Sequence, residues 1–113
     1  MDAYNANPTS MKAALENFNK LTRGPKTVVL GDMFELGTTS DQEHQYVADL
    51  ALSMPFDHIY LIGKAFSATR AKNAFTFENF ESFSKAVSLK GTHGSLLVKG
   101  SRGMQLERIL DFF

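Results

Sequence analysis

The sequence contains no cysteine, and its formal net charge is zero because twelve basic residues balance twelve acidic ones. Without cysteine the chain has no disulfide bond, no thiolate zinc site and no cysteine nucleophile. The balanced charge provides no electrostatic footprint for nucleic acid or an anionic membrane, so we expect neither as a partner. The histidines, His44, His58 and His93, lie far apart without the spacing of metal ligands, and we therefore expect no metal site.

Long apolar runs are also missing. No run reaches the roughly 18–20 residues that a membrane-spanning helix needs, and the N-terminus lacks the pattern of a signal peptide. We therefore expect no membrane span and a cytoplasmic location. The chain nevertheless has the material for a core, because 43% of its 113 residues are apolar and ten are phenylalanine. A chain of this length is expected to form one domain.

Short apolar runs predict the strands of a sheet. The runs Thr27–Leu30 and His58–Ile62 each end at a glycine, as expected of strands that are buried on both faces. Further strands are predicted at Ala74–Phe77 and Ser95–Val98.

Apolar residues at helical spacing predict helices between these strands. The first predicted helix is capped by Thr9 or Ser10 and ends near Leu21. The second is opened by a capping box at Ser40 and ends at Met54. Three more are predicted: a short one over Ala65–Ala71, one from Asn79 to Val87, and a final one from Gly103 to Phe113. Helices that connect successive strands favour a mostly parallel sheet with helices on both faces. The predicted fold class is α/β, a three-layer αβα Rossmann-like domain.

In a parallel sheet, the loops that follow the strands share one edge. This rule predicts that four polar segments lie on a common rim: Asp2–Asn7, Asp32–Gly37, Gly63-Lys64 and Lys99–Gly103. We take this rim as the candidate site.

The first of these segments runs directly into the first predicted helix. The carboxylate of Asp2, the amides of Asn5 and Asn7 and the free N–H groups of the helix would point at one spot, which suits a phosphate, a ribose or a carboxylate. A tight turn followed by an N-cap is the alternative, and the pattern leaves it open. Tyr4 is expected to pack under the loop.

The last segment, Lys99–Gly103, connects a strand to a helix. Its two glycines allow a ligand to approach the backbone, and Arg102 can hold a carboxylate through two parallel hydrogen bonds. Such a turn suits the C-terminal carboxylate of a dipeptide. The alternative is a connection whose basic side chains are merely solvated.

The other polar residues of the rim carry weaker signals. Asp32 and Glu35 are candidates for acid–base chemistry or magnesium binding, although acids in such loops more often cap the backbone, which we favour for Glu35. His44 could face the rim, but a lone helix histidine is usually a surface residue. Gly63-Lys64 is similar to the end of a P-loop, but the required earlier glycine is missing. Phe34 is expected to pack.

Three segments resemble signature motifs of the Mur ligase family, in the family's order. They are Asp2–Met11, Leu30–Gly37 and Val98–Met104, and together they reach across nearly the whole chain. The first is most similar to the motif that opens the C-terminal domain of those members that add D-alanyl-D-alanine to UDP-N-acetylmuramoyl-tripeptide in peptidoglycan synthesis.

The resemblance implies an activity for a larger enzyme. Mur ligases use ATP and Mg²⁺ to convert a substrate carboxylate into an acyl phosphate, which the amine of an amino acid or dipeptide attacks. Their central domain carries the P-loop and the magnesium ligands, and neither is found in this sequence. We therefore expect residues 1–113 to be one domain excised from a three-domain enzyme. It would close over the central ATPase domain, contribute no catalytic residue and be inactive alone.

The resemblance also assigns roles to individual residues. Asp2 and Asn5 would contact the nucleotide, with Asp2 at the ribose. The residues that would contact the dipeptide are Asn7, Lys99, Ser101 and Arg102. Asp32 and Glu35 match a motif without an assigned role.

Two alternatives remain open from the sequence. The chain could belong to another Mur-type ligase or to a folylpolyglutamate synthetase-type ligase. It could also be a receiver-like signalling module, because Asp32 at a strand end and Lys99 after the last strand mimic a phosphoacceptor pocket. Against the second alternative, Lys99 is followed by glycine and not by proline.

Overall fold

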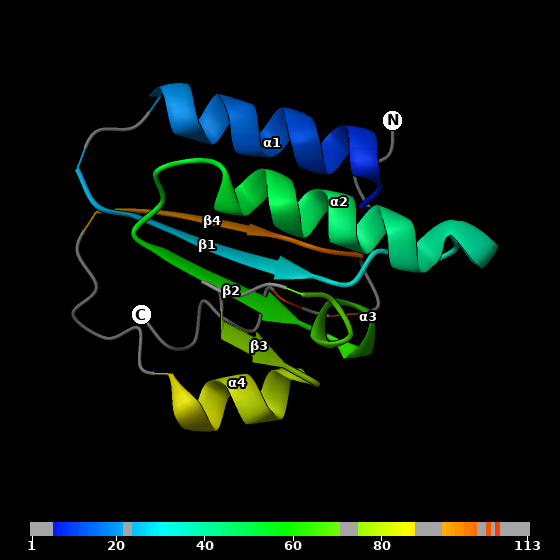
Figure 1. Cartoon of the computed structure of the whole chain (residues 1–113). Helices are drawn as coiled ribbons and strands as arrows, with labels where there is room; N and C mark the ends of the chain where they lie inside the picture. The colour runs from blue at the N-terminus through cyan, green and yellow to red at the C-terminus, as the bar shows by residue number, and fades with distance from the viewer. Residues whose placement is uncertain are drawn as a thin grey trace.

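The fold is seen in a computed structural model that describes residues 6–21, 24–70, 75–87 and 94–101, together with 104 and 106. Its elements in chain order are α1 (Pro8–Leu21), β1 (Lys26–Gly31), the 3₁₀ turn η1 (Gly37–Thr39), α2 (Ser40–Leu52), β2 (His58–Ile62), α3 (Lys64–Ser67), β3 (Phe75–Phe77), α4 (Phe80–Ala86) and β4 (Ser95–Lys99) (Figure 1). The alternation of helices and strands confirms the predicted α/β class.

The four strands form one sheet in the order β3-β2-β1-β4, and each neighbouring pair is parallel. Strand β1 is central, with Thr27 paired to His58 of β2 on one side and to Leu96 of β4 on the other. The chain moves outward from β1 to β3 and then crosses back to place β4 beside β1. This order is that of doubly wound α/β domains, in which ligands collect where the strand order reverses.

Helices cover both faces of the sheet, which confirms the predicted three layers. Figure 1 shows α1 and α2 on one face and α4 on the other. The side chains of β1 alternate accordingly: Val28 and Leu30 pack with α1 and α2, while Val29 packs with α4. Both groups are fully buried, so the run that reads as continuously apolar in the sequence serves two separate cores.

The α1–α2 core is the larger of the two. Its apolar members outside β1 are Ala6, Met11, Leu15, Phe18, Met33, Val47, Ala48, Ala51, Ile59, Leu61 and Phe66. The core on the α4 face contains Val29, Ile62, Phe80, Phe83 and Leu106. Leu106 is one of the two described residues of the predicted final helix, and the rest of that helix lies outside the described residues.

Helix α1 begins two or three residues earlier than the sequence suggested. Its cap is Asn7, whose side-chain oxygen accepts a hydrogen bond from the N–H of Ser10 at 2.9 Å. The N–H of Asn7 in turn donates to the hydroxyl of Ser10 at 3.0 Å. Pro8 then occupies the first helical position, where its fixed φ and missing N–H are tolerated. Ser10 is therefore the partner of the cap and not the cap itself.

Helix α2 begins at Ser40, but the predicted capping box is wrong. The preceding residue, Thr39, ends the 3₁₀ turn η1 and makes no side-chain cap hydrogen bond. Ser40 is already helical, and its carbonyl oxygen lies 2.7 Å from Nδ1 of His44. The local sequence favoured a capping box, but the side chains of Ser40 and His44 face each other instead.

Two helices end earlier than predicted because hydroxyl groups occupy their last carbonyls. The hydroxyl of Ser53 donates to Leu50 O at 2.6 Å, and α2 ends at Leu52. The hydroxyl of Thr69 donates to Phe66 O at 2.6 Å, and α3 ends at Ser67. Such side chains compete with the backbone for the free carbonyls at a helix C-terminus.

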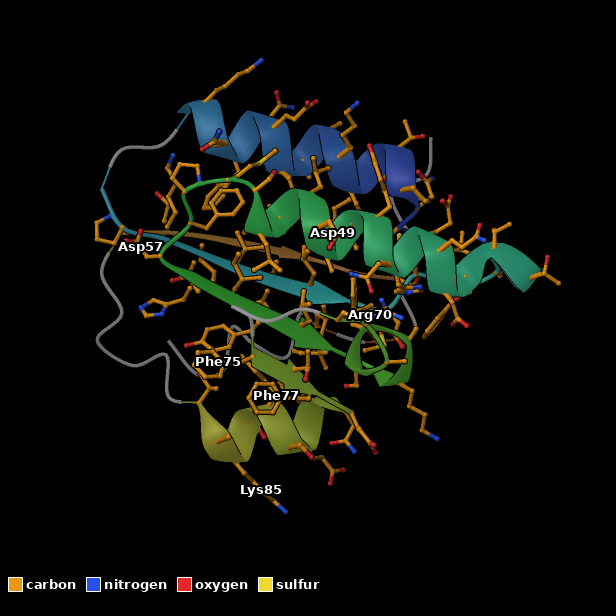
Figure 2. All side chains as sticks on the ribbon, in the orientation of Figure 1. Asp49, Asp57, Arg70, Phe75, Phe77 and Lys85 are labelled. Atoms are coloured by element: carbon orange, nitrogen blue, oxygen red, sulfur yellow. The ribbon has the colours of Figure 1, made fainter. Side chains whose placement is uncertain are left out.

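At the end of the sheet where the strands begin, a side chain links two neighbouring strands. The carboxylate of Asp57 accepts a hydrogen bond from the N–H of Lys26 at 2.6 Å, which links the starts of β1 and β2. Figure 2 shows Asp57 at the opposite end of the sheet from Arg70. The loops that could bind a ligand therefore gather at the other, carboxyl edge.

Candidate functional site

The structure gathers parts of all four predicted rim segments at the carboxyl edge of the sheet. Figure 1 shows the start of α1, the ends of β1 and β4, and α3 on the same side of the molecule. Ala6, directly before α1, belongs to the same core cluster as Met33 of the loop after β1. Of the predicted site residues, Asp2, Asn5 and Arg102 lie outside the described residues, as does Tyr4.

Asp32 follows β1 and is almost buried, with 8% of its surface exposed. Its two carboxylate oxygens accept hydrogen bonds from the N–H groups of Ala65 at 2.9 Å and Phe66 at 3.0 Å. Its backbone N–H donates to Ile62 O, and its carbonyl accepts from the N–H of Ser101, both at 3.1 Å. Asp32 thus caps α3 and joins the ends of three strands. The pairing of Asp32 with Glu35 for acid–base or magnesium chemistry stays a prediction, and both Asp32 oxygens already accept one backbone hydrogen bond each.

Gly63 makes the approach of Asp32 possible. Its φ of +128° is one that residues with a side chain rarely adopt, and a Cβ at this position would overlap the carboxylate of Asp32. The N–H of Gly63 donates to Phe77 O at 2.7 Å, which ties the turn to β3. The glycine that resembled part of a P-loop therefore has a steric function.

His44 is completely buried, so the expectation that it is a surface residue is wrong. Its Nε2 accepts a hydrogen bond from the backbone N–H of Met33 at 2.9 Å. Because a backbone N–H requires an acceptor, this nitrogen carries no proton, and Nδ1–H donates to Ser40 O. The ring also lies edge-on to Phe66, with centroids 4.8 Å apart. His44 therefore holds the loop after β1 from inside the core and is not exposed at the rim.

Ser101 is also buried, with 2% of its surface exposed. Its hydroxyl oxygen accepts a hydrogen bond from the N–H of Phe34 at 2.7 Å, and its own N–H donates to Asp32 O. The N–H groups of Asp32, Met33 and Phe34 therefore all have defined acceptors. The loop after β1 is held by the end of β4 on one side and by α2 on the other.

Beyond Phe34 the loop projects into solvent. Phe34 is 42% exposed, so the expectation that it packs is only partly correct. Glu35 has a φ of +64° and is exposed. The hydrogen bonds between described residues that hold the loop do not involve the Glu35 side chain, so the predicted backbone cap is not found among them.

Lys99 and Asn7 flank this loop. Lys99 ends β4 opposite Leu30 and is half-buried. Strand alternation places its side chain on the face of Leu97, which packs in the α1–α2 core. Asn7 is also half-buried at the start of α1, with its side-chain oxygen engaged in the cap.

On the α4 face the rim contains a hollow of about 300 Å³, here called the β2–β3 hollow. It is lined by Asp32, Gly63, Lys64, Glu78, Asn79, Phe80 and Met104. The sequence reasoning missed Glu78 and Asn79, although they follow a predicted strand and so belong to the same edge. The strand β3 is short and weakly patterned, and its following turn was not included in the rim.

In the part of the chain that the structure describes, no group of three or more His, Asp or Glu side chains is arranged to hold a metal ion. None of the helices in that part combines the length and the apolar character required to cross a membrane.

Comparison with protein families gives a match over most of the chain. The model of the family described as "Mur ligase, glutamate ligase domain" matches residues 1–102. The chain is 37% identical over 119 residues to UDP-N-acetylmuramoyl-tripeptide–D-alanyl-D-alanine ligase of Bacillus subtilis, covering 96% of the chain and 26% of that relative. It is 33% identical over 120 residues to the ligase of the same name from Rickettsia prowazekii, covering 99% of the chain and 26% of that relative.

Solved structures resemble the fold over the same extent. MurF from Acinetobacter baumannii superposes with a TM-score of 0.78 at 36% identity, over 97% of this chain and 26% of that one. MurF ligase from Thermotoga maritima in complex with ADP superposes with a TM-score of 0.79 at 26% identity, over 99% of this chain and 26% of that one. The chain thus spans about a quarter of the length of these relatives.

Proposed function

The chain belongs to the Mur ligase family, and from that premise we propose that it acts within the ATP-dependent ligase that adds D-alanyl-D-alanine to UDP-N-acetylmuramoyl-tripeptide in peptidoglycan synthesis. It would be the C-terminal domain of a longer three-domain enzyme located in the cytoplasm. The single observation that carries the proposal is the rim, where the loop after β1 is hydrogen-bonded to Ser101 after β4 and shares a core cluster with Ala6 before α1. The names of its relatives specify which member of the family it is similar to.

The proposed contribution of this domain is positioning. By resemblance, the central domain would activate the tripeptide carboxylate as an acyl phosphate, and this domain would bring the dipeptide amine to it. Holding two reactants in line is worth roughly 7–11 kcal/mol of barrier in favourable cases. A held rim suits this role, because a loop whose backbone donors at Asp32, Met33 and Phe34 are engaged loses little further freedom there when a ligand binds.

Within this proposal the ligand contacts are divided by chemistry. Asp2 and Asn5 would meet the nucleotide, in keeping with the ADP complex of the Thermotoga maritima relative. The dipeptide contacts would come from Asn7, Lys99 and Arg102. Ser101 would act through its support of Phe34, since its hydroxyl is buried.

The described residues do not fit a magnesium site. Asp32 is the one carboxylate that lies at the centre of the rim, and both of its oxygens accept backbone hydrogen bonds. We therefore assign Mg²⁺ and the phosphates of ATP to the central domain.

The alternatives are less well supported. A receiver-like phosphoacceptor would need an accessible aspartate at the end of β1, and Asp32 is buried and capped. Another Mur-type or folylpolyglutamate synthetase-type ligase would share the fold, but the relatives compared above carry the name of the D-alanyl-D-alanine-adding enzyme.

A domain exchange tests the proposal. This chain would replace the corresponding quarter of the Bacillus subtilis relative, and ligation would be measured from ATP, UDP-N-acetylmuramoyl-tripeptide and D-alanyl-D-alanine. We expect ATP-dependent ligation by the chimera and none by the 113-residue chain alone. A folded, ATP-binding chimera that ligates a different amino acid or dipeptide in preference would overturn the proposal, and so would turnover by the chain alone.

Arg102 provides a finer test in the same chimera. Arg102→Ala should raise the KM for dipeptide far more than the KM for ATP, because a carboxylate clamp is lost. Equal effects on both constants would contradict the assignment of Arg102 to the dipeptide.

A further inference from the structure

We propose that the β2–β3 hollow is a specificity subsite for a small peptide that carries a single carboxylate, and that Lys64 supplies a cation to this carboxylate in addition to the one that the sequence motif assigns to Arg102. The proposal rests on the proposed function, since it adds a ligand contact that neither the sequence motifs nor the comparisons assign. Its evidence is independent of the motifs: the shape of the hollow, its charges and the way its backbone is held.

The hollow has the size and lining expected for a dipeptide with small side chains. Its volume is about 300 Å³, and it opens at the carboxyl edge of the sheet between the turns after β2 and β3. Phe80 and Met104 form an apolar part of its wall, against which methyl groups could be buried. The polar part comes from Lys64, Glu78 and Asn79.

The charged side chains that line the hollow are one cation, Lys64, and two carboxylates, Asp32 and Glu78. The carboxylate of Asp32 is buried and accepts hydrogen bonds from the N–H groups of Ala65 and Phe66. Lys64 and Glu78 are exposed, and the salt bridges found among the described residues do not include either of them. A carboxylate is therefore attracted to Lys64, while Glu78 opposes a ligand that brings a second negative charge.

Asp32 occupies two of the backbone donors at the start of α3, because it accepts the N–H groups of Ala65 and Phe66. We therefore assign the carboxylate of the ligand to a side chain. Lys64 supplies the one basic group among the residues that line the hollow.

The backbone that carries Lys64 is held before a ligand arrives. Gly63, which precedes it, donates its N–H to Phe77 O at 2.7 Å and accepts from the N–H of Ser67 at 3.0 Å. Across the hollow, Asn79 caps α4 by accepting a hydrogen bond from the N–H of Ser82 at 2.8 Å, which holds the turn that carries Glu78. Both walls are fixed, and preorganisation of this kind reduces the entropic cost of binding.

Binding to the 113-residue chain can be measured directly by heteronuclear NMR titration. The probes are D-alanyl-D-alanine, its C-terminal amide and D-alanyl-D-glutamate. The variants are Lys64→Gln, Lys64→Arg and Glu78→Gln. The matched control is Lys85→Gln, which makes the same charge change on α4, where Figure 2 shows Lys85 pointing away from the sheet.

We expect D-alanyl-D-alanine to perturb the signals of Gly63, Lys64 and Asn79. Lys64→Gln should raise its Kd by about tenfold to a hundredfold, because a hydrogen bond to a charged group is lost. Lys64→Arg should retain most of the affinity, and Lys85→Gln should leave it unchanged. The amide lacks the carboxylate, so it should bind equally weakly to the unmodified chain and to Lys64→Gln. Glu78→Gln removes the opposing negative charge and should improve the binding of D-alanyl-D-glutamate.

Any one of three results overturns the proposal. The first is that millimolar D-alanyl-D-alanine does not perturb the signals of the hollow. The others are equal losses of affinity in Lys64→Gln and Lys85→Gln, and equal binding of the dipeptide and its amide. Retained chemical shifts in the core distinguish a binding defect from unfolding. Ligation by the chimera without binding in the hollow would refute only this subsite, whereas binding in the hollow with an inactive chimera would refute only the proposed function.

Discussion

The hydroxyl oxygen of Ser101 accepts a hydrogen bond from the backbone N–H of Phe34 at 2.7 Å, although 67 residues separate them in the chain. Together with the bond between the N–H of Ser101 and Asp32 O, it joins the turn after β4 to the loop after β1. These two loops lie beside the point where the strand order reverses. The rim is thus held by a side chain that the sequence motifs assign to ligand binding.

Ser101→Ala should lower the free energy of unfolding by about 1–2 kcal/mol, because the N–H of Phe34 loses its partner while remaining partly buried. Chemical denaturation followed by circular dichroism measures this change. Ser84→Ala removes an exposed hydroxyl from α4 and should change stability by less than about 0.5 kcal/mol. Similar losses in both variants would show that the Ser101 hydroxyl does not support the loop.

His44→Leu should lower the free energy of unfolding by about 1–3 kcal/mol, because the buried N–H of Met33 would be left without an acceptor. Equilibrium unfolding in urea gives the value, and His44→Gln, which retains an acceptor, should recover part of it. The comparison is His58→Leu, at an exposed histidine of β2, with an expected change within about 0.5 kcal/mol. A His44→Leu protein as stable as the unmodified chain would contradict this role.

Gly63→Ala should be severely destabilising, by about 3 kcal/mol, since strain at φ +128° adds to the overlap of the new methyl group with Asp32. Thermal unfolding of the purified variants tests this. Gly37→Ala is the matched control: its φ is also positive, at +62°, but nothing lies within 4 Å of the added carbon. It should cost only about 1–2 kcal/mol, and equal losses at the two positions would argue against the steric role of Gly63.

Glu35→Gly should stabilise the chain by about 0.5–1 kcal/mol, because glycine adopts the φ of +64° without the penalty that a side chain incurs. The melting temperature of the variant would rise. Glu43→Gly, the same substitution inside α2, should instead cost about 1 kcal/mol. A loss of stability in Glu35→Gly would mean that the Glu35 side chain makes a stabilising contact in the folded chain.

Several features of the fold were predictable because they depend on local pattern. The continuous apolar run at Val28–Leu30 indicated a strand buried on both faces, and it lies at the centre of the sheet. The rule that loops share the carboxyl edge of a parallel sheet placed Asp32, Gly63 and Ser101 together, and the structure agrees. The ends of the helices were less predictable, because the hydroxyls of Ser53 and Thr69 can bond either to solvent or to a helix carbonyl.

By itself the sequence determined the α/β class, the three layers and the family, because hydrophobic periodicity and motif order are properties of neighbouring residues. The tertiary structure alone decided what the polar residues do. Asp32 finds its donors 33 and 34 positions away, and His44 finds Met33 only because α2 folds back onto the sheet. A carboxylate or an imidazole has the same sequence signature whether it meets a ligand or a backbone N–H. The choice between the two is made by which segments the strand order brings together.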